Sequence, residues 1–448
     1  MIEKYYSGVI EQIYNRIGKE TRNIVMANYS NDFSIENLEV IRRYQSNEDN
    51  VFFAYSEFSY NTLVGAYEPF LDIICNMHRR FIGGSFDDFQ KECGVYYLHR
   101  QVLNSYYETG ECFREETVLL NEVAYEQRRM TKAIVDMLKR LSEVRPLMIV
   151  INRFQMASKS SIETIKYLID NPCTNIGIVL GVNVQVKGTD STVEVWDRIV
   201  ESLEDRSAIY YIGSAGQQKN HIRDTSDDEL YITTNFEQSI QEASNIMEFL
   251  DYEQAKRGCR IIEHKIKFED AWIDEKSLRR FYLIYARTSV LLGEMSKAIE
   301  LTNEYKALIP ESDSEHYFSI YYFMKGTCYM YQGKLEKAEG CAKKAYDYAL
   351  LADDELLEFK SELLSVMIKM SGWYNIFFCV QDIPVSDEFI EKIIKHGYRN
   401  HLAHIYIYAY DNSRDVVKQS FYDESLLKHF TKGLELAKKI GNEQLVYD

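Results

Sequence analysis

A short apolar run with a polar tip, followed by an amphipathic helix, constrains the first half of this chain. Leu147–Ile151 are all apolar, as in a strand that a parallel sheet buries on both faces. Asn152 and Arg153 follow directly, at the strand end where open α/β sheets place their ligands. Apolar residues then recur at helical spacing between residues 162 and 169. The segment predicts one strand–loop–helix unit of an α/β domain.

Four further apolar runs predict strands of the same sheet. They cover Asn23–Ala27, Val51–Phe58, Asn175–Val184 and Ala208–Ile212. Helical patterns lie between them, over residues 1–20, Leu38–Tyr44 and most of 80–144. Five buried strands separated by helices predict a doubly wound parallel sheet.

Charge and cysteine usage narrow the class of protein. Of the 448 residues, 69 are acidic and 52 basic, which gives a net charge of −17. Such a surface repels phosphate backbones, so we expect no direct nucleic-acid binding by this chain. No apolar run approaches the roughly 18 residues of a membrane span, no signal peptide opens the chain, and the eight cysteines form no C-x-x-C pair. These features predict a cytoplasmic protein without membrane contact, in a reducing compartment.

The loop after the first predicted strand occupies the place of a phosphate-binding P-loop. That loop requires G-x-x-x-x-G-K-[ST], because its glycines let backbone N–H groups approach the phosphates. Residues 28–37 read NYSNDFSIEN and contain neither glycine nor lysine. When the next helix is aligned on Leu38, Ile35 stands at the lysine and Glu36 at the magnesium-binding hydroxyl, with Ser34 before them. The segment is interpreted as a decayed P-loop, and an unrelated βα loop remains the alternative.

Together these residues resemble the signal-transduction ATPases of the STAND group, the maltose-activator and LuxR-type large regulators. In that family the magnesium-binding strand ends in two acids, and a stretch like H-W-A-D-x-x-S leads into a leucine-rich helix. Here Asn152 and Arg153 replace the acids, and residues 155–158 (QMAS) replace H-W-A-D. The resemblance implies a degenerate P-loop-NTPase-like domain over residues 1–230, with Asn183 at the position that senses the γ-phosphate. A structural ion pair is the favoured role of Arg153, and a phosphate contact is the alternative.

The second half predicts a tetratricopeptide-like solenoid over residues 231–448. Arg279–Pro310 and Ser319–Leu350 place small residues in the same register, as close helix crossings require. Weaker copies are expected at Phe236–Lys265, at Glu358–Phe378 with Gly372-Trp373 at the inter-helix turn, and as a late helix pair at Phe421–Val446. The fold class is therefore α/β plus all-α. Because solenoids need caps and none is obvious before Asp448, we expect either a fragment or an end that docks a partner.

The concave face of the repeats is the candidate partner site. Aromatic anchors there would bind a peptide or protein, and the alternative is that these side chains contact only neighbouring helices. The groove-facing positions of the two best repeats are Arg280, Leu283, Arg287, Phe323, Thr327 and Tyr331.

His396, His401 and His404 cluster in one late segment. On a helix, His401 and His404 share a face, as two metal ligands would. No acid or cysteine completes the set nearby in the sequence, so ordinary packing or surface roles are favoured and no metal is expected. The histidines and serines show no nucleophile–base pattern.

The resemblance implies a bacterial regulatory protein that acts as a non-catalytic signalling or transcription-regulatory scaffold. The lysine, the magnesium ligand and the catalytic acid of an NTPase are all missing from the expected positions, so a pseudo-ATPase without cofactor is expected. Residual ATP or ADP binding is left open. Partners would be a protein or peptide in the repeat groove, and oligomers could form through the sheet domain. The alternatives are an active ATP-binding switch with an atypical loop and a peptide-pheromone receptor.

Overall fold

The computed structural model describes most of the chain, and the two parts it forms are compact. The described residues are 2–30, 38–46, 50–59, 63–186, 193–212, 235–268, 273–375, 385–408, 424–442 and 446. Unit 1 comprises residues 1–95, 102–113 and 126–271, and unit 2 comprises residues 96–101, 114–125 and 272–448. Two short segments of the first half therefore belong to the unit of the C-terminal helices. The domain boundary expected at residue 230 lies outside the described residues and stays a prediction.

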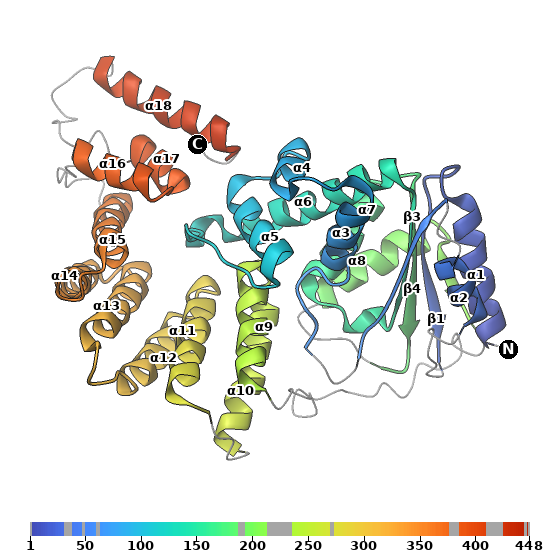
Figure 1. Ribbon diagram of the computed structural model, residues 1–448, viewed down its shortest axis with the longest axis horizontal. Helices are drawn as coiled ribbons and strands as arrows, with labels where there is room; N and C mark the ends of the chain where they lie inside the picture. Colours follow the sequence, from blue (N-terminus) through green and yellow to red (C-terminus); the bar gives the residue numbers. More distant parts are fainter. Residues whose placement is uncertain are drawn as a thin grey trace. The chain divides into compact units, whose positions relative to one another are not determined.

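Unit 1 contains the five-stranded parallel sheet that the apolar runs predict, and its order is β2-β3-β4-β1-β5 (Figure 1). The strands are β1 (Ile24–Tyr29), β2 (Phe52–Glu57), β3 (Leu147–Asn152), β4 (Ile176–Asn183) and β5 (Ile209–Tyr211). Every residue of β3 and β4 is buried, which is why both read as continuous apolar runs.

Helices cover both faces of the sheet. Helices α1 (Ile2–Arg16) and α2 (Glu39–Ser46) pack on one face through a cluster that includes Tyr6 and Ile10 of α1 and Ile41 of α2. The opposite face carries α3 (Phe70–Met77), α7 (Lys159–Asp170) and α8 (Val193–Glu204) (Figure 1). The other helices of this half are a π-helical turn (His78–Ile82), α4 (Phe86–Glu92), α5 (Tyr97–Thr109) and α6 (Val123–Val144), with 3₁₀ turns at Leu120–Glu122 and Phe154–Met156.

Helices α9 (Phe236–Glu248) and α10 (Tyr252–Phe268) pair with each other and belong to unit 1. Asp251, in the turn between them, accepts a hydrogen bond from the backbone N–H of Ser160 at 3.0 Å. The side-chain amide of Gln254 donates to the carbonyl of Val64 at 2.9 Å. These bonds fix the helix pair to the start of α7 and to the segment between β2 and α3.

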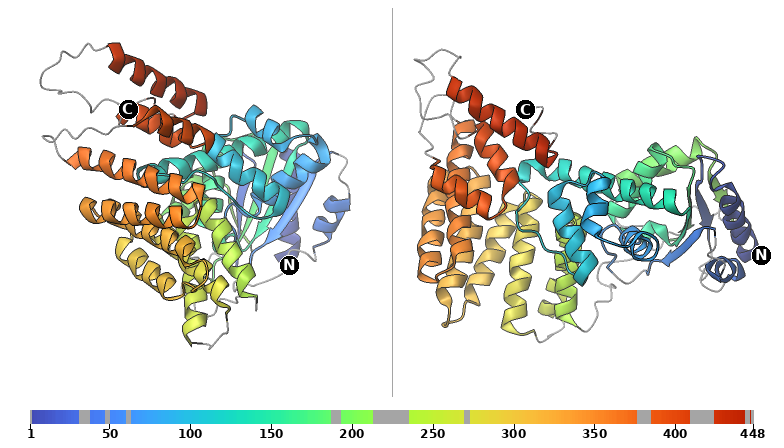
Figure 2. Two further views of the ribbon diagram at one scale, coloured as in Figure 1. Left: turned by 60° about the vertical axis from the view of Figure 1, so that its left-hand side comes forward. Right: turned by 45° about the horizontal axis from the view of Figure 1, so that its top comes forward.

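Unit 2 is a run of stacked, paired helices, which confirms the predicted solenoid region (Figure 2). The two best repeats are the pairs α11–α12 and α13–α14, whose turns contain Gly293 and Gly333 at φ of 77° and 71°. Gly326 of α13 is a close crossing point, because an added Cβ would lie 3.1 Å from the Leu364 side chain. The helices are α11 (Glu275–Leu291), α12 (Met295–Ala307), α13 (Ser314–Tyr331), α14 (Leu335–Leu351), α15 (Glu355–Asn375), α16 (Asp387–Lys395), α17 (Arg399–Tyr408) and α18 (Glu424–Ile440).

One detail of the predicted array is wrong. Residues 372 and 373 lie inside α15 instead of forming an inter-helix turn. A glycine inside a helix costs only about 1 kcal/mol, so a helix that continues to pack does not have to end there. Of the late pair expected at Phe421–Val446, the described residues show one helix, α18, which ends before Gly441 and packs against α17; residues 421–423 and 443–445 lie outside the described residues, so the pair stays a prediction.

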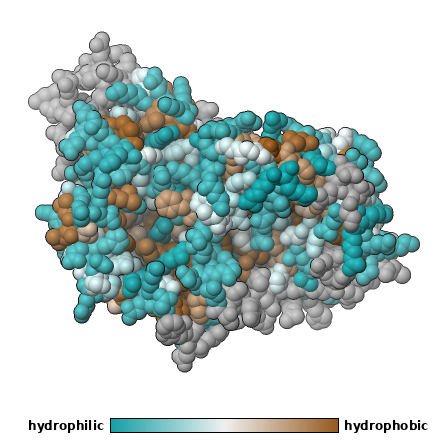
Figure 3. Space-filling view, viewed as in Figure 1, coloured by the Kyte–Doolittle hydropathy of each residue, from teal (hydrophilic) through white to brown (hydrophobic). Residues whose placement is uncertain are grey.

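The surface is polar over the face drawn in Figure 3, where apolar residues form scattered small groups. Within the described ranges, no helix is both long and apolar enough to cross a membrane.

Candidate functional site

The carboxyl ends of β1, β3 and β4 are the first candidate site, because the strand order reverses there. From β1 the chain moves to β2 at one edge of the sheet, and from β4 it crosses β1 to β5 at the other edge. Ligands of open α/β sheets bind at such a switch point. Ser34, Ile35 and Glu36, the vestigial P-loop positions, lie outside the described residues.

Asn152, at the end of β3, is fully buried and is held by β1. The hydroxyl of Tyr29 donates to Asn152 Oδ1 at 2.6 Å. The strand between them, β4, contributes Gly181 at this level. A Cβ there would lie 2.7 Å from Asn152 Oδ1 and would also collide with the Tyr6 hydroxyl. A glycine on the middle strand therefore lets two polar side chains meet across it.

Arg153 makes the structural ion pair that was favoured for it. Its backbone is left-handed, with φ of 54°, which turns the chain sharply out of β3. The guanidinium Nη1 lies 3.1 Å from Glu57 Oε1 at the end of β2 and donates to the carbonyl of Phe58 at 3.3 Å. The positive charge closest to the end of β3 is thus matched by a carboxylate.

Asn183, the position expected to sense a γ-phosphate, bonds within its own turn. Its Oδ1 accepts from the backbone N–H of Gln185 at 3.0 Å. Its backbone N–H donates to Gln155 Oε1 at 3.3 Å, which ties the end of β4 to the 3₁₀ turn after β3. Tyr29, Asn152, Arg153 and Asn183 are therefore each bonded to a neighbouring protein group, whereas the buried Asn28 Oδ1 and Gln155 Nε2 have no hydrogen-bond partner among the residues that the structure describes.

The groove-facing residues of the array differ in their surroundings. Arg280 is exposed, and Leu283 and Arg287 are half-buried. The hydroxyl of Thr327 donates to the carbonyl of Phe323 in its own helix at 3.0 Å. Tyr331 differs from the others, because its hydroxyl accepts a hydrogen bond from the backbone N–H of Leu120 at 3.3 Å.

Leu120 belongs to the inserted segment, residues Arg114–Tyr125, which is part of unit 2. Its first half has no regular secondary structure and bends at Glu115 and Glu116, and its burial alternates: Arg114, Glu116 and Val118 are buried, whereas Glu115 and Thr117 are exposed. Alternation with period two is how an extended peptide lies on a protein surface. The inserted segment thus lies on the helices of unit 2 as a peptide ligand would.

The carboxylate of Glu116 binds the N-terminus of α17. Its Oε1 accepts from the backbone N–H of His401 at 2.7 Å and lies 2.6 Å from His401 Nδ1. Its Oε2 accepts from the backbone N–H of Asn400 at 3.2 Å and from the Tyr97 hydroxyl. The first N–H groups of a helix have no partner within it and attract negative charge, so a carboxylate is the natural occupant. Burial and the charge of Glu116 raise the pKa of Tyr97.

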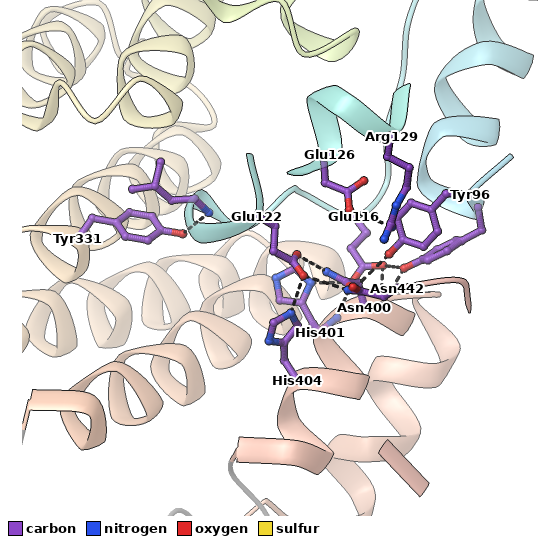
Figure 4. Close-up of polar contacts among 12 residues, drawn as sticks. Tyr96, Glu116, Glu122, Glu126, Arg129, Tyr331, Asn400, His401, His404 and Asn442 are labelled. Atoms are coloured by element: carbon purple, nitrogen blue, oxygen red, sulfur yellow. Dashed lines mark hydrogen bonds and ion pairs between the residues drawn. The ribbon is translucent and has the colours of Figure 1, made fainter. Parts of the chain in front are cut away.

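The carboxylate of Glu122 binds three side chains further along (Figure 4). Its Oε1 lies 2.9 Å from His404 Nε2 and accepts from Asn442 Nδ2 at 2.9 Å, and its Oε2 accepts from Asn400 Nδ2 at 2.7 Å. Burial acts to raise the pKa of Glu122, but the hydrogen bonds and the charge of His404 outweigh it and lower that pKa to about 2. The buried carboxylate is therefore strongly stabilised in its charged form.

The histidine cluster of the sequence is divided between two roles. His396 stacks on Phe359 with ring centroids 4.4 Å apart. His401 and His404 each meet a glutamate that lies more than 280 residues earlier in the chain. Within the part of the chain that the structure describes, no three His, Cys, Asp or Glu residues are placed to hold a metal ion. The sequence of residues 112–118 (CFREETV) does not alternate between apolar and polar residues, so neither the course of the segment nor its partners could be predicted from it.

No protein-family model matches the chain, and no curated protein matches it. The structure shows a five-stranded parallel α/β domain followed by stacked paired helices. Any function has to be argued from the sheet edge and from the residues that hold the inserted segment.

Proposed function

We propose that this chain is a non-catalytic regulatory scaffold of a bacterial signalling or transcription pathway. Its α/β domain would be an ATPase-like module without turnover, and its helical array would bind a peptide or protein. The first part of the proposal is supported by the bonds that the polar side chains at the sheet edge already make within the protein. Asn152 bonds to Tyr29, Arg153 pairs with Glu57, and Asn183 closes its own turn.

A bound nucleotide would have to compete with these internal bonds. Phosphate sites rely on backbone N–H groups and on a cation whose charge is available to the ligand. The charge of Arg153 is already paired with Glu57. Breaking the pair would leave the carboxylate of Glu57 beside the incoming phosphate. Each hydrogen bond to a charged group that is broken in this way costs about 1.5–3 kcal/mol of free energy.

The second part of the proposal is supported by the inserted segment. Its carboxylates and backbone groups are bound by α13, by α17 and by Asn442, two residues after α18. Helices that hold one extended segment of their own chain have the donors needed to hold an extended partner. The same observation favours the peptide-receptor reading as the second candidate function.

A magnesium–ATP titration of the full chain tests the proposal. We expect no magnesium-dependent rise in melting temperature at millimolar nucleotide and no phosphate release above a no-protein blank. A true site would stabilise the native state by about 2.7 kcal/mol when ATP is present at 100 times its dissociation constant.

Magnesium-dependent stabilisation with turnover would overturn the scaffold and support the ATP-binding switch. Arg153→Met is the matched variant in that case. If nucleotide binds at the sheet edge, this substitution weakens binding. If binding is unchanged by the substitution, the nucleotide lies elsewhere.

A further inference from the structure

We propose that the residues around Glu116 and Glu122 form a binding site for an acidic partner peptide, which the inserted segment occupies in the absence of that partner. The ligand would be an extended peptide with two carboxylates six residues apart, as in Glu116 and Glu122. The inference rests on the proposed function, because it names the partner class of the same array.

Two adjoining carboxylate positions define the ligand (Figure 4). The first consists of the backbone N–H groups of Asn400 and His401 with the His401 ring. The second consists of His404, Asn442 and the Asn400 side chain. Asn400 contributes to both positions, through its backbone to one and its amide to the other. This shared residue fixes the separation between the two acids.

Between and beside the acids, the contacts go to the backbone of the segment. The hydroxyl of Tyr398 donates to the carbonyl of Glu115 at 2.8 Å, and Tyr331 accepts from the N–H of Leu120 at 3.3 Å. Backbone contacts of this kind accept any sequence that can extend in the same way. Specificity would therefore come from the two acids and from the apolar residues between them.

The inserted segment has the features of a ligand that can be exchanged. Its regular elements are the 3₁₀ turn Leu120–Glu122 and the first three residues of α6, and alternate side chains of its first half are exposed. A tethered segment competes at an effective concentration of roughly millimolar, so a free peptide has to overcome that value. The segment ends in α6, and β3 is the next strand of the chain.

The probe is a synthetic peptide of residues 113–123, FREETVLLNEV, labelled and added to the full chain. Its matched control is FREQTVLLNQV, in which both relevant acids are neutral. The protein is compared as wild type and as the double variant Glu116→Gln/Glu122→Gln, whose own segment competes less well. We expect the double variant to bind the acidic peptide at least about tenfold more tightly than wild type does, because the tethered competitor is weakened. The neutral peptide should bind neither protein.

The proposal is overturned if the folded double variant binds both peptides equally or binds neither. If the double variant does not fold, hydrogen exchange of the wild type decides. Saturating acidic peptide should raise amide exchange over residues 115–122, and unchanged exchange there would overturn the proposal.

The two proposals fail separately. If the peptide has no effect and ATP does not bind, the proposed non-catalytic function stands and the proposed peptide site is overturned. ATP turnover would overturn the proposed non-catalytic function, and the peptide-binding result would then be interpreted independently of it.

Discussion

Replacing Glu122 with glutamine removes one buried negative charge and keeps the shape of the side chain. The pKa of Glu122 is lowered from 4.5 to about 2, in spite of burial, by His404, Asn442 and Asn400. Each pH unit of displacement corresponds to about 1.4 kcal/mol, so the charged form contributes about 3 kcal/mol to the stability of unit 2. Because the folded pKa is the lower one, this contribution is present above about pH 4.5 and is lost as the pH falls towards about 2.

The assay compares wild type with Glu122→Gln by urea unfolding and by hydrogen exchange of α17, between about pH 7 and about pH 3. The variant should be less stable by about 2–3 kcal/mol at neutral pH, and the difference should shrink in acid. Glu115→Gln is the matched control, since Glu115 is exposed and its loss should change stability by less than about 0.5 kcal/mol. The electrostatic reasoning would be refuted if Glu122→Gln lowered the free energy of unfolding equally at both ends of the pH range, or did not lower it at neutral pH.

Further substitutions test the packing and the hydrogen bonds of both units. Gly181→Ala should destabilise unit 1 by about 1–3 kcal/mol in urea unfolding, because its Cβ would collide with the Tyr6 hydroxyl. Gly340→Ala, on an exposed face of α14 with open space around it, should instead stabilise unit 2 by up to about 1 kcal/mol. Asp251→Ala should cost about 1–3 kcal/mol and speed proteolysis at the α9–α10 turn, because the buried N–H of Ser160 loses its acceptor; a protein as resistant as wild type would contradict this.

The sheet and the two best helix pairs could be predicted because they rest on local patterns. A strand buried on both faces needs a continuous apolar run, and Leu147–Ile151 provides one. A close helix crossing needs small residues at fixed spacing, and Gly326 is one of them. The turn expected at Gly372 was wrong for a related reason. A lone glycine marks a turn only when the packing of the helix also ends there.

At the sheet edge, the residue types could be predicted but their pairing could not. The sequence places Asn152 and Arg153 at a strand end, but it predicts Tyr29 in the loop after the first strand, whereas β1 extends to Tyr29. Their partners depend on the strand order, which puts β4 between β1 and β3, and on Gly181 leaving room across it. Strand order is set by crossover connections between distant segments, and no local pattern records it.

The sequence by itself determined the elements of this protein: apolar runs for five strands, the helix pairs, and a stretch at residues 28–37 without glycine or lysine. Only the tertiary structure decided which polar groups meet. Glu116 reaches His401, and Glu122 reaches His404, across more than 280 residues of chain. Hydrophobic periodicity is written in neighbouring residues, whereas a buried carboxylate gives no local sign of the donors that stabilise it. The residues that hold the inserted segment are therefore defined by the fold alone.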